Sequence, residues 1–412
     1  MHNDRFLFFT NECVGLGHLR RTLTLAQAVA DSDESSNSLI VTGSAVGMGP
    51  PTSQRVDTVK LPSLARDPDG TKRARTLHVD ADDVRAMRSS IALAVARSFE
   101  PGVAVIDKTP LGLGGELAPT LEWLKSSSCR LVLGLRDIEG NASAVRRAWL
   151  RPGIRAAIDR YFDCVLVYGP PSPFDAISCL GWDDIDVAVH HVGYLGAPVP
   201  DHGPADLPSP YLLVTVGGGV DGYPVAACVV DAVRLAPLPI PTVVVTGPLM
   251  PHSEVAALER RAEGLDVRVL DFRPDMASVV AGARAVVGMA GYNTVSEVRR
   301  AGKPALLVPR IAPSDEQLIR ATSLAGAGVV DMLHPSVLTP ARMREALDLL
   351  LDPGRRRPVS EDHNGLPAAV AVLTRLAAAQ RAPGRVRLTL AGTMERKPEP
   401  SNGSSNRTGT TK

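Results

Sequence analysis

The sequence lacks several features that would have restricted the protein to a particular class. It has no apolar run near the roughly 20 residues that a transmembrane helix needs, so no membrane-spanning segment is expected. Phe6 to Thr10 is too short for a signal-peptide core, and Glu12 follows closely. The net charge of +1 gives no strong attraction to nucleic acid.

Cysteine is also sparse. The five cysteines are scattered, with no C-x-x-C pair, at positions 13, 129, 164, 179 and 228. This distribution is typical of reduced cytoplasmic thiols and excludes a disulfide framework or a zinc-binding cluster as an interpretation. We therefore expect a cytoplasmic protein, either free or bound peripherally at the inner face of the membrane.

The composition is that of an ordinary globular protein, with 44% hydrophobic and 22% charged residues. A chain of 412 residues is long enough for two domains. Short Val/Leu/Ile runs that end at Gly, Pro or Asp alternate with helical patterns in both halves, which predicts parallel, doubly wound α/β sheets. The predicted strands are Arg5–Thr10, Leu39–Thr42, Val103–Asp107, Arg130–Leu135, Val165–Tyr168, Tyr211–Val216, Thr242–Thr246, Val267–Leu270, Ala285–Val287 and Ala305–Val308.

A proline-rich segment marks the boundary between the halves, because five prolines and two glycines fall between Leu195 and Pro210. We predict a first domain over residues 1–195, a linker over 196–210 and a second domain over 211–355. A further helix is expected within 356–382. The tail over 383–412 is rich in Ser, Gly, Asn, Thr and Lys, and it is expected to be disordered.

The most informative stretch is residues 288–322, which contains two successive strand–loop–helix units. Gly291, Tyr292, Asn293 and Thr294 open one helix, and Glu297 lies one turn inside it. Asp315, Glu316 and Gln317 open the next. Backbone N–H groups and a helix dipole at the edge of a parallel sheet hold phosphates, and a carboxylate beside them suits the two hydroxyls of a ribose. The pattern therefore predicts a sugar-nucleotide site.

A second glycine-rich loop follows the first predicted strand of the second half. It contains Gly217, Gly218, Gly219 and, after Val220 and Asp221, Gly222. Glycines there allow a phosphate or sugar to approach the backbone N–H groups. A simple tight turn rarely needs four glycines in six positions, so we predict that this loop contacts the ligand.

The first half contributes a candidate general base. Gly15, Gly17 and His18 follow the first strand and open the first helix, where the dipole lowers the pKa of an imidazole. Asp107, at the end of another strand, is placed to orient that imidazole. The simpler interpretation is that His18 caps its helix and Asp107 satisfies loop N–H groups. Glu116 and Asp137 share the same sheet edge and are alternative bases for an acceptor.

Two other patterns carry less information. Asp67-Pro68-Asp69 is similar to a D-x-D metal motif, but it lacks a flanking strand and a proline divides it, so we read it as loop and expect no metal site. Arginines interleave with apolar residues over Arg146 to Phe162, which is typical of a solvated basic face over a core-facing stripe; contact with a membrane surface or an anionic acceptor is the alternative.

Together, the Gly-Leu-Gly-His opening, the loop at 217–222 and the Gly-Tyr-Asn-Thr-x-x-Glu…Glu-Gln segment resemble the GT-B glycosyltransferases. They are most similar to the group that contains the bacterial lipid-linked muropeptide N-acetylglucosaminyltransferase and its uncharacterised relatives. The resemblance covers roughly residues 5–355 and implies two Rossmann-like domains that face across a cleft. The first half departs from the family, since its glycine-rich loop is reduced to Gly15 and Gly17.

The resemblance also implies roles for individual residues. Glu297 corresponds to the acid that binds the ribose, while Gly291, Asn293 and Thr294 correspond to the diphosphate cradle. Glu316 and Gln317 fall where the family binds the donor sugar, Phe272 where backbone atoms bind the base, and Arg310 beside the diphosphate or sugar. His18 matches the histidine that in some members is a base paired with an aspartate, and Asp107 lies at a fitting distance along the chain.

We therefore expect a metal-independent transferase with no cofactor, which moves a sugar, from a UDP-linked donor, to an unidentified acceptor with inversion. The acceptor would be a small molecule, a natural product or a lipid-linked glycan. The alternatives are a sugar-nucleotide epimerase or hydrolase of the same fold, and a non-catalytic subunit that binds nucleotide sugars.

Overall fold

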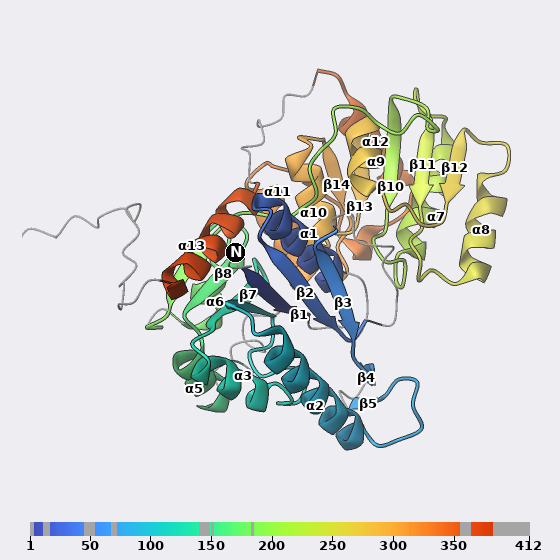
Figure 1. The fold of residues 1–412 in the computed structure, drawn as a ribbon. Helices are drawn as coiled ribbons and strands as arrows, with labels where there is room; N and C mark the ends of the chain where they lie inside the picture. The colour runs from blue at the N-terminus through green and yellow to red at the C-terminus, as the bar shows by residue number, and fades with distance from the viewer. Residues whose placement is uncertain are drawn as a thin grey trace, which may run out of the picture.

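The chain folds into two α/β units that lie side by side, each built around one parallel sheet (Figure 1). The structure is a computed structural model that describes residues 4–10, 17–44, 54–66, 72–139, 149, 152–182, 185–312, 314–354 and 364–381. Within these residues, no helix is long and apolar enough to cross a membrane.

The sheet of the first unit has the strand order β3-β2-β1-β6-β7-β8-β9, with every pairing parallel. Its strands are β1 Arg5–Phe9, β2 Asn37–Thr42, β3 Val56–Lys60, β6 Val103–Asp107, β7 Arg130–Arg136, β8 Cys164–Tyr168 and β9 Ala188–His191. Its helices are α1 Gly17–Ser32, α2 Ala81–Phe99, α3 Ala118–Ser126, α5 Pro152–Tyr161 and α6 Ala176–Leu180. A small antiparallel pair, β4 Leu64–Arg66 and β5 Lys72–Ala74, projects from the unit.

The second unit repeats the plan with the strand order β12-β11-β10-β13-β14-β15. Its strands are β10 Tyr211–Thr215, β11 Thr242–Val245, β12 Val267–Leu270, β13 Ala283–Gly288, β14 Ala305–Leu307 and β15 Asp331–Met332. Its helices are α7 Tyr223–Leu235, α8 His252–Ala262, α9 Met276–Gly282, α10 Tyr292–Arg300, α11 Glu316–Gly326, the 3-10 turn η1 Pro335–Val337 and α12 Pro340–Leu351. The two sheets confirm the predicted doubly wound α/β class.

All ten predicted strands are present, with their ends within two residues of the expected positions. The strands that the sequence did not reveal are edge strands or very short. In β3, only Val56 is buried and the next two residues are exposed, so no continuous apolar run marks the strand. β9 lies at the other edge and contains two histidines, and β15 has two residues.

The chain crosses between the two units twice, and the two crossings are bonded to each other. Tyr194 and Asn364 form a parallel bridge, and the N–H of Gly365 donates to the carbonyl of Tyr194 at 2.8 Å. A Cβ on Gly365 would lie 2.5 Å from the carbonyl oxygen of Gly193, so the two backbones approach as closely as glycine permits. The two crossings are therefore hydrogen-bonded to each other where the chain re-enters the first unit.

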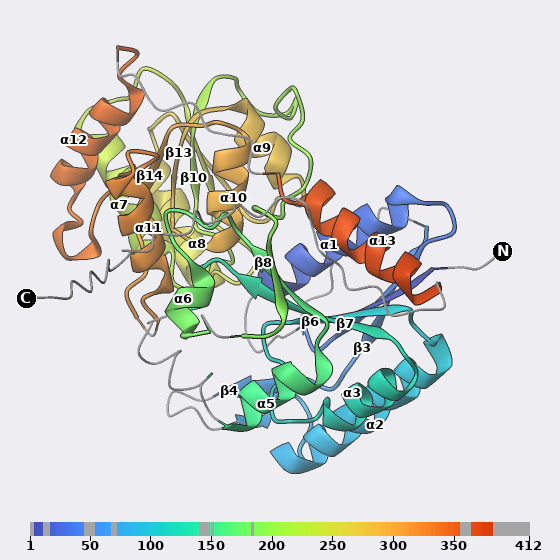
Figure 2. The ribbon, with the colours of Figure 1, turned by 90° about the vertical axis from the view of Figure 1, so that its left-hand side faces the viewer.

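After the second crossing, α13 (Leu366–Arg381) returns to the first unit and packs against α1 (Figure 2). Leu373 and Ala369 are fully buried in the cluster that also contains Leu25 and Val29 of α1. Since α1 carries His18 in its first turn, the last helix of the described chain holds in place the helix that carries the candidate base.

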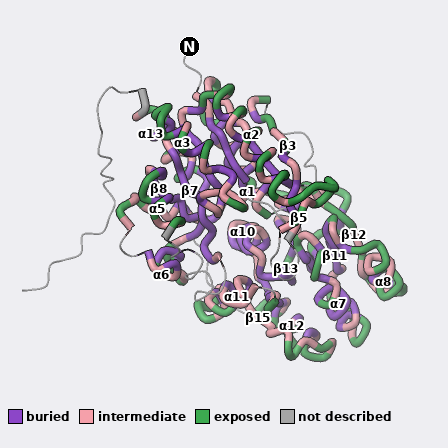
Figure 3. Tube along the Cα trace, turned by 90° about the horizontal axis from the view of Figure 1, so that it is seen from below, coloured by how far each residue is buried: buried purple, intermediate pink, exposed green. Residues whose placement is uncertain are grey.

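Buried residues are concentrated in the two sheets and on the helix faces that cover them, and α10 lies between the units (Figure 3). One apolar cluster runs continuously from α1 and α13, through Tyr194 and Tyr292, to the face of the second sheet that α10 covers. The rings of Tyr194 and Tyr292 lie 5.6 Å apart between centroids. This shared core positions α10 against the first unit.

Candidate functional site

The start of α10 is an open helix N-terminus. Gly291 is the N-cap residue, and among the described residues the structure shows no side-chain cap for the first N–H groups of the helix. A Cβ placed on Gly291 would meet no atom of the described residues within 4 Å, so the structure described leaves room beside the N-cap. Unpaired N–H groups and the positive end of the helix dipole make this position favourable for an anion such as a phosphate.

The glycine-rich loop that follows β10 combines two requirements. Gly219 has a φ of +93°, and a Cβ there would lie 2.5 Å from the carbonyl oxygen of Thr246, so tight packing between loops requires this glycine. Gly217 also has a positive φ, +64°, but a Cβ there would meet nothing within 4 Å. The loop is therefore shaped partly by packing, and it leaves the open side of Gly217 for a ligand.

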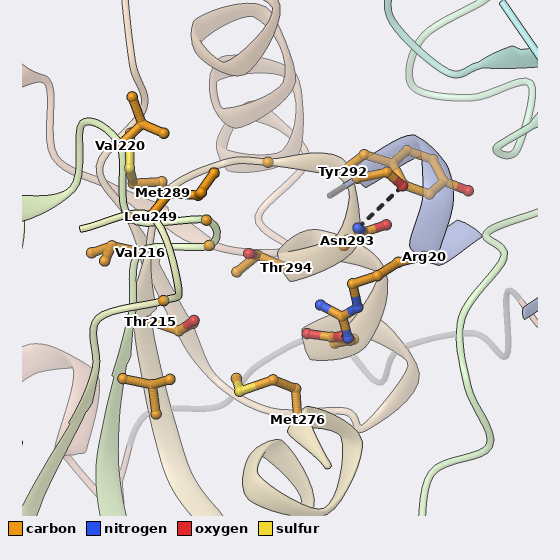
Figure 4. A pocket seen from close by; sticks show the side chains of 18 of the residues that line it. Arg20, Thr215, Val216, Val220, Leu249, Met276, Met289, Tyr292, Asn293 and Thr294 are labelled. Atoms are coloured by element: carbon orange, nitrogen blue, oxygen red, sulfur yellow. Dashed lines mark hydrogen bonds and ion pairs between the residues drawn. The ribbon is translucent and has the colours of Figure 1, made fainter. Parts of the chain in front are cut away.

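These two features border one cavity of about 440 Å³ between the units. Figure 4 shows Asn293 and Thr294 at the start of α10, with Val220 and Leu249 on the opposite wall. The structure brings to this cavity every residue that the sequence assigned to the donor side, together with two from the first unit: Gly17, His18, Gly217, Gly218, Gly219, Asp221, Phe272, Gly291, Tyr292, Asn293, Thr294, Glu297, Arg310, Glu316 and Gln317.

The two carboxylates predicted to bind sugar hydroxyls are both paired with arginines of the first unit. Arg20 donates to Glu297 Oε1 at 2.7 Å, and Arg136 contacts Glu316 Oε2 at 2.8 Å. Burial tends to raise the pKa of Glu316, but Arg136 and Arg320 outweigh that effect and hold it below its usual value. The charged form of Glu316, which only accepts hydrogen bonds, is thus favoured.

Arg310 and Gln317 join the helix start of α11 to the glycine-rich loop. The N–H of Arg310 donates to Gln317 Oε1 at 3.1 Å, and the Arg310 guanidinium contacts Asp221 at 3.2 Å and Glu316 at 3.4 Å. Phe272 remains 48% exposed, which leaves an apolar surface at the rim of the cavity.

The partly buried His18 and the buried Asp107 form a pair on the side of the first unit. The Nδ1 atom of His18 lies 2.5 Å from Asp107 Oδ2, and Arg21 donates to Asp107 Oδ1 at 2.6 Å. Arg21 also lies 3.0 Å from His18 Nδ1, but the shorter contact favours a proton on Nδ1 that is donated to Asp107. The Nε2 atom then carries the lone pair that can accept a proton from a substrate.

The surroundings of His18 and Asp107 favour the protonation states that a general base and its partner need. Burial lowers the pKa of His18 below its usual value, Asp107 opposes that shift, and Arg21 and Arg136 add to it. Burial would raise the pKa of Asp107, but Arg21 and His18 reduce it to about 2. At neutral pH the imidazole is neutral and the carboxylate is charged.

Other predicted acceptor-side residues do not reach the cavity. Glu116 is buried, pairs with Arg88 at 3.1 Å and accepts from the N–H of Gly114 at 2.7 Å. Asp137 accepts two hydrogen bonds from Arg320, at 2.8 and 2.9 Å, in a buried pair between the units. Both carboxylates are committed to arginines, so neither is placed to serve as a base for an acceptor in this cavity.

Some sequence predictions lie outside the described residues. These are Gly15, the Asp67-Pro68-Asp69 stretch, the tail over 383–412 and much of the arginine-rich stretch before Phe162. The arginines at 155 and 160 are described, and both form surface pairs, with Asp159 and Glu122. At these two positions the arginines belong to a solvated basic face, as predicted.

Sequence reasoning missed the arginines that border the cavity from the first unit: Arg20, Arg21 and Arg136. Two of them follow His18 by two and three residues, and Arg136 precedes Asp137. The sequence around an arginine does not indicate which distant residue its long side chain contacts, so these contacts between the units could not be predicted. The apolar lining from Met276, Met289 and Leu249 was likewise not expected.

Comparisons with known proteins agree with this geometry. Residues 212–372 match the family model of the glycosyltransferase family 28 C-terminal domain. The chain is 26% identical over 309 residues to the UDP-N-acetylglucosamine--N-acetylmuramyl-(pentapeptide) pyrophosphoryl-undecaprenol N-acetylglucosamine transferase of Chelativorans sp. (strain BNC1). That alignment covers 70% of this chain and 78% of the relative. Alignments with other proteins of the same name cover 24% to 46% of their length.

Solved structures support the same architecture. The calicheamicin glycosyltransferase CalG4 has a TM-score of 0.57 at 18% identity, with 92% of this chain and 95% of that one covered. MurG of Acinetobacter baumannii has a TM-score of 0.56 at 18% identity, with 90% and 99% covered. At this identity the likeness shows the fold, which is GT-B.

Proposed function

We propose that this chain, a glycosyltransferase of the GT-B fold that is similar to the MurG group, transfers a sugar from a UDP-linked donor to a hydroxyl of an acceptor with inversion. The observation that carries the proposal is that the N-terminus of α10 and His18, which Asp107 contacts from behind the cavity wall, border the same cavity. One is suited to a leaving diphosphate and the other to a proton acceptor.

On the donor side, the ribose hydroxyls would donate to Glu297 and the sugar hydroxyls to Glu316 and Gln317. The diphosphate would lie at the N–H groups of Asn293 and Thr294 and against the loop at Gly217. The uracil ring of the donor would lie at the rim of the cavity, beside Phe272. All of these residues line the same cavity, which supports the assignment.

In the transfer step, Nε2 of His18 takes the proton of the acceptor hydroxyl as the oxygen attacks the anomeric carbon. The bond from that carbon to the diphosphate oxygen breaks, and the nucleotide diphosphate leaves with the electron pair. Its negative charge grows in the transition state, so the helix N-terminus stabilises that state more than the bound substrate. Asp107 stabilises the imidazolium that forms.

The donor assignment predicts that UDP and a UDP-sugar raise the melting temperature of the protein in a panel that also contains TDP, GDP and their sugars. Ligands that bind only the folded state stabilise it by mass action, by about 2.7 kcal/mol at one hundred times the Kd. Differential scanning fluorimetry measures the shift. The donor site would be overturned if no nucleotide in the panel moved the melting temperature.

The acceptor is tested separately by following UDP release with a panel of small-molecule alcohols, natural-product aglycones and lipid-linked muropeptides. Turnover that requires one of these acceptors supports transfer. Equal release of UDP without any acceptor favours a hydrolase, and change of the sugar without release favours an epimerase. UDP binding with no turnover across the whole panel favours a binding subunit.

The His18–Asp107 geometry predicts a specific pH profile. Because the base must be neutral and burial lowers its pKa, kcat/KM should rise with pH through a midpoint below the usual histidine value and be level at pH 7. In Asp107→Asn the midpoint should move to still lower pH, since Asp107 raises the pKa of His18. Initial rates between pH 4.5 and 8.5 measure both profiles; a midpoint above pH 7 would contradict the assignment.

A further inference from the structure

Arg20 belongs to the first unit and lines the half of the cavity assigned to the donor. Its side chain extends from the first turn of α1 to α10, below Asn293 and Thr294 (Figure 4). Among the described residues its guanidinium contacts Glu297 Oε1 at 2.7 Å, and its side chain is 31% exposed. Its carboxylate partner is the one expected to take the ribose hydroxyls.

Each of the other arginines described along the cavity is buried against a carboxylate or contacts two of them. Arg21 is buried against Asp107, and Arg273 is bonded to Asp206 and Asp275. Arg310 contacts Asp221 and Glu316, and Arg136 contacts Glu139 as well as Glu316. Within the described lining, Arg20 combines a single carboxylate contact with a partly exposed side chain.

A nucleotide diphosphate brings negative charge into this space, next to the ribose that Glu297 binds. We propose that Arg20 is a donor-binding residue supplied by the acceptor-side unit, and that it bridges Glu297 and the diphosphate in the bound state. The inference rests on the proposed function. In this arrangement, Arg20 contacts the diphosphate from the opposite side of the cleft.

The chemistry of arginine supports the bridge. A guanidinium carries five N–H donors in a rigid fork, so one edge can stay on the carboxylate while another binds a phosphate oxygen. Such charge-assisted bonds are stronger than neutral ones. Because Arg20 belongs to the first unit and the α10 N-terminus to the second, a diphosphate held by both joins the two walls of the cavity.

The test compares the Kd values of uridine, UMP and UDP for wild-type protein and Arg20→Ala by isothermal titration calorimetry. We expect Arg20→Ala to raise the Kd of UDP by about 10- to 100-fold, as for loss of a hydrogen bond between charged groups. The Kd of uridine should stay within about threefold, because Glu297 remains free to bind the ribose. Arg20→Lys should recover part of the UDP affinity, since it keeps the charge but loses the fork.

Arg342→Ala is the matched control, because Arg342 forms an exposed pair with Glu345 on α12, outside the cavity lining. Its Kd for UDP should equal that of the wild type. Equal weakening of uridine and UDP by Arg20→Ala would show that Arg20 acts only by positioning Glu297 and would overturn the inference, as would unchanged UDP binding. Wild-type protein that binds none of the three would instead overturn the proposed donor site.

Discussion

His18→Ala is expected to lower kcat by about 10²- to 10⁴-fold, the usual contribution of a positioned general base. The imidazole of His18 borders the cavity, and Nδ1 contacts Asp107 at 2.5 Å. That contact orients the ring and leaves Nε2 available to accept a proton. Without the imidazole, the acceptor hydroxyl must lose its proton to water. The donor contacts are made by other residues, so the Kd of UDP should change by less than about threefold.

The measurement is the rate of UDP release with saturating donor and acceptor, beside calorimetric titration with UDP. His252→Ala is the control, because His252 is exposed at the start of α8 and does not line the cavity. Asp107→Asn should also reduce kcat strongly, since the amide favours the wrong tautomer of the imidazole. If His18→Ala kept kcat within threefold of the wild type, the base assignment would be wrong.

Asp137→Ala is expected to lower the free energy of unfolding by about 3–5 kcal/mol, the usual cost of breaking a buried ion pair. Arg320 is 1% exposed, and both oxygens of Asp137 accept from it. Removing the carboxylate leaves a buried guanidinium with Ala290 as its remaining acceptor in the described structure. Since the pair joins the two units, the loss should also weaken their contact.

Urea unfolding followed by circular dichroism measures this effect. Glu345→Ala removes a pair that is 64–65% exposed, and it should cost less than about 1 kcal/mol. The double variant Asp137→Leu with Arg320→Met should regain most of the stability, because apolar residues can replace a buried pair at little cost. A single variant no less stable than the Glu345 control would contradict this role for Asp137.

The sequence was sufficient for the fold because the central strands carry an unambiguous signal. β6, β8 and β10 are buried at all five positions, and their Val/Leu-rich runs predicted them almost to the residue. The end of α10 was equally clear: Gly302 has a φ of +60° directly after the helix, which the Gly-Lys-Pro sequence indicated. Edge strands such as β3 have one side in solvent, so their composition does not distinguish them from loops.

In the candidate site, the donor side was predictable from the sequence and the acceptor side was not. Residues on the donor side belong to loops and helix starts of one sheet edge, and the order of strands alone places them together. On the acceptor side, the role of each carboxylate depends on the arginine with which it pairs. Glu116 pairs with Arg88, and Asp137 pairs with Arg320. Long side chains choose their partners through three-dimensional packing, which a single sequence does not encode locally.

The position of α13 also affects how the protein is made. Its Leu373 and Ala369 cover the apolar side of α1, yet residues 33–365 must be synthesised between these two helices. At 5–20 residues per second, this leaves α1 without its cover for roughly 15 to 70 s during translation. A growing chain therefore has exposed apolar surface beside the candidate base until its last described helix emerges, and a ribosome stalled after β15 would hold a protein unable to complete its first unit.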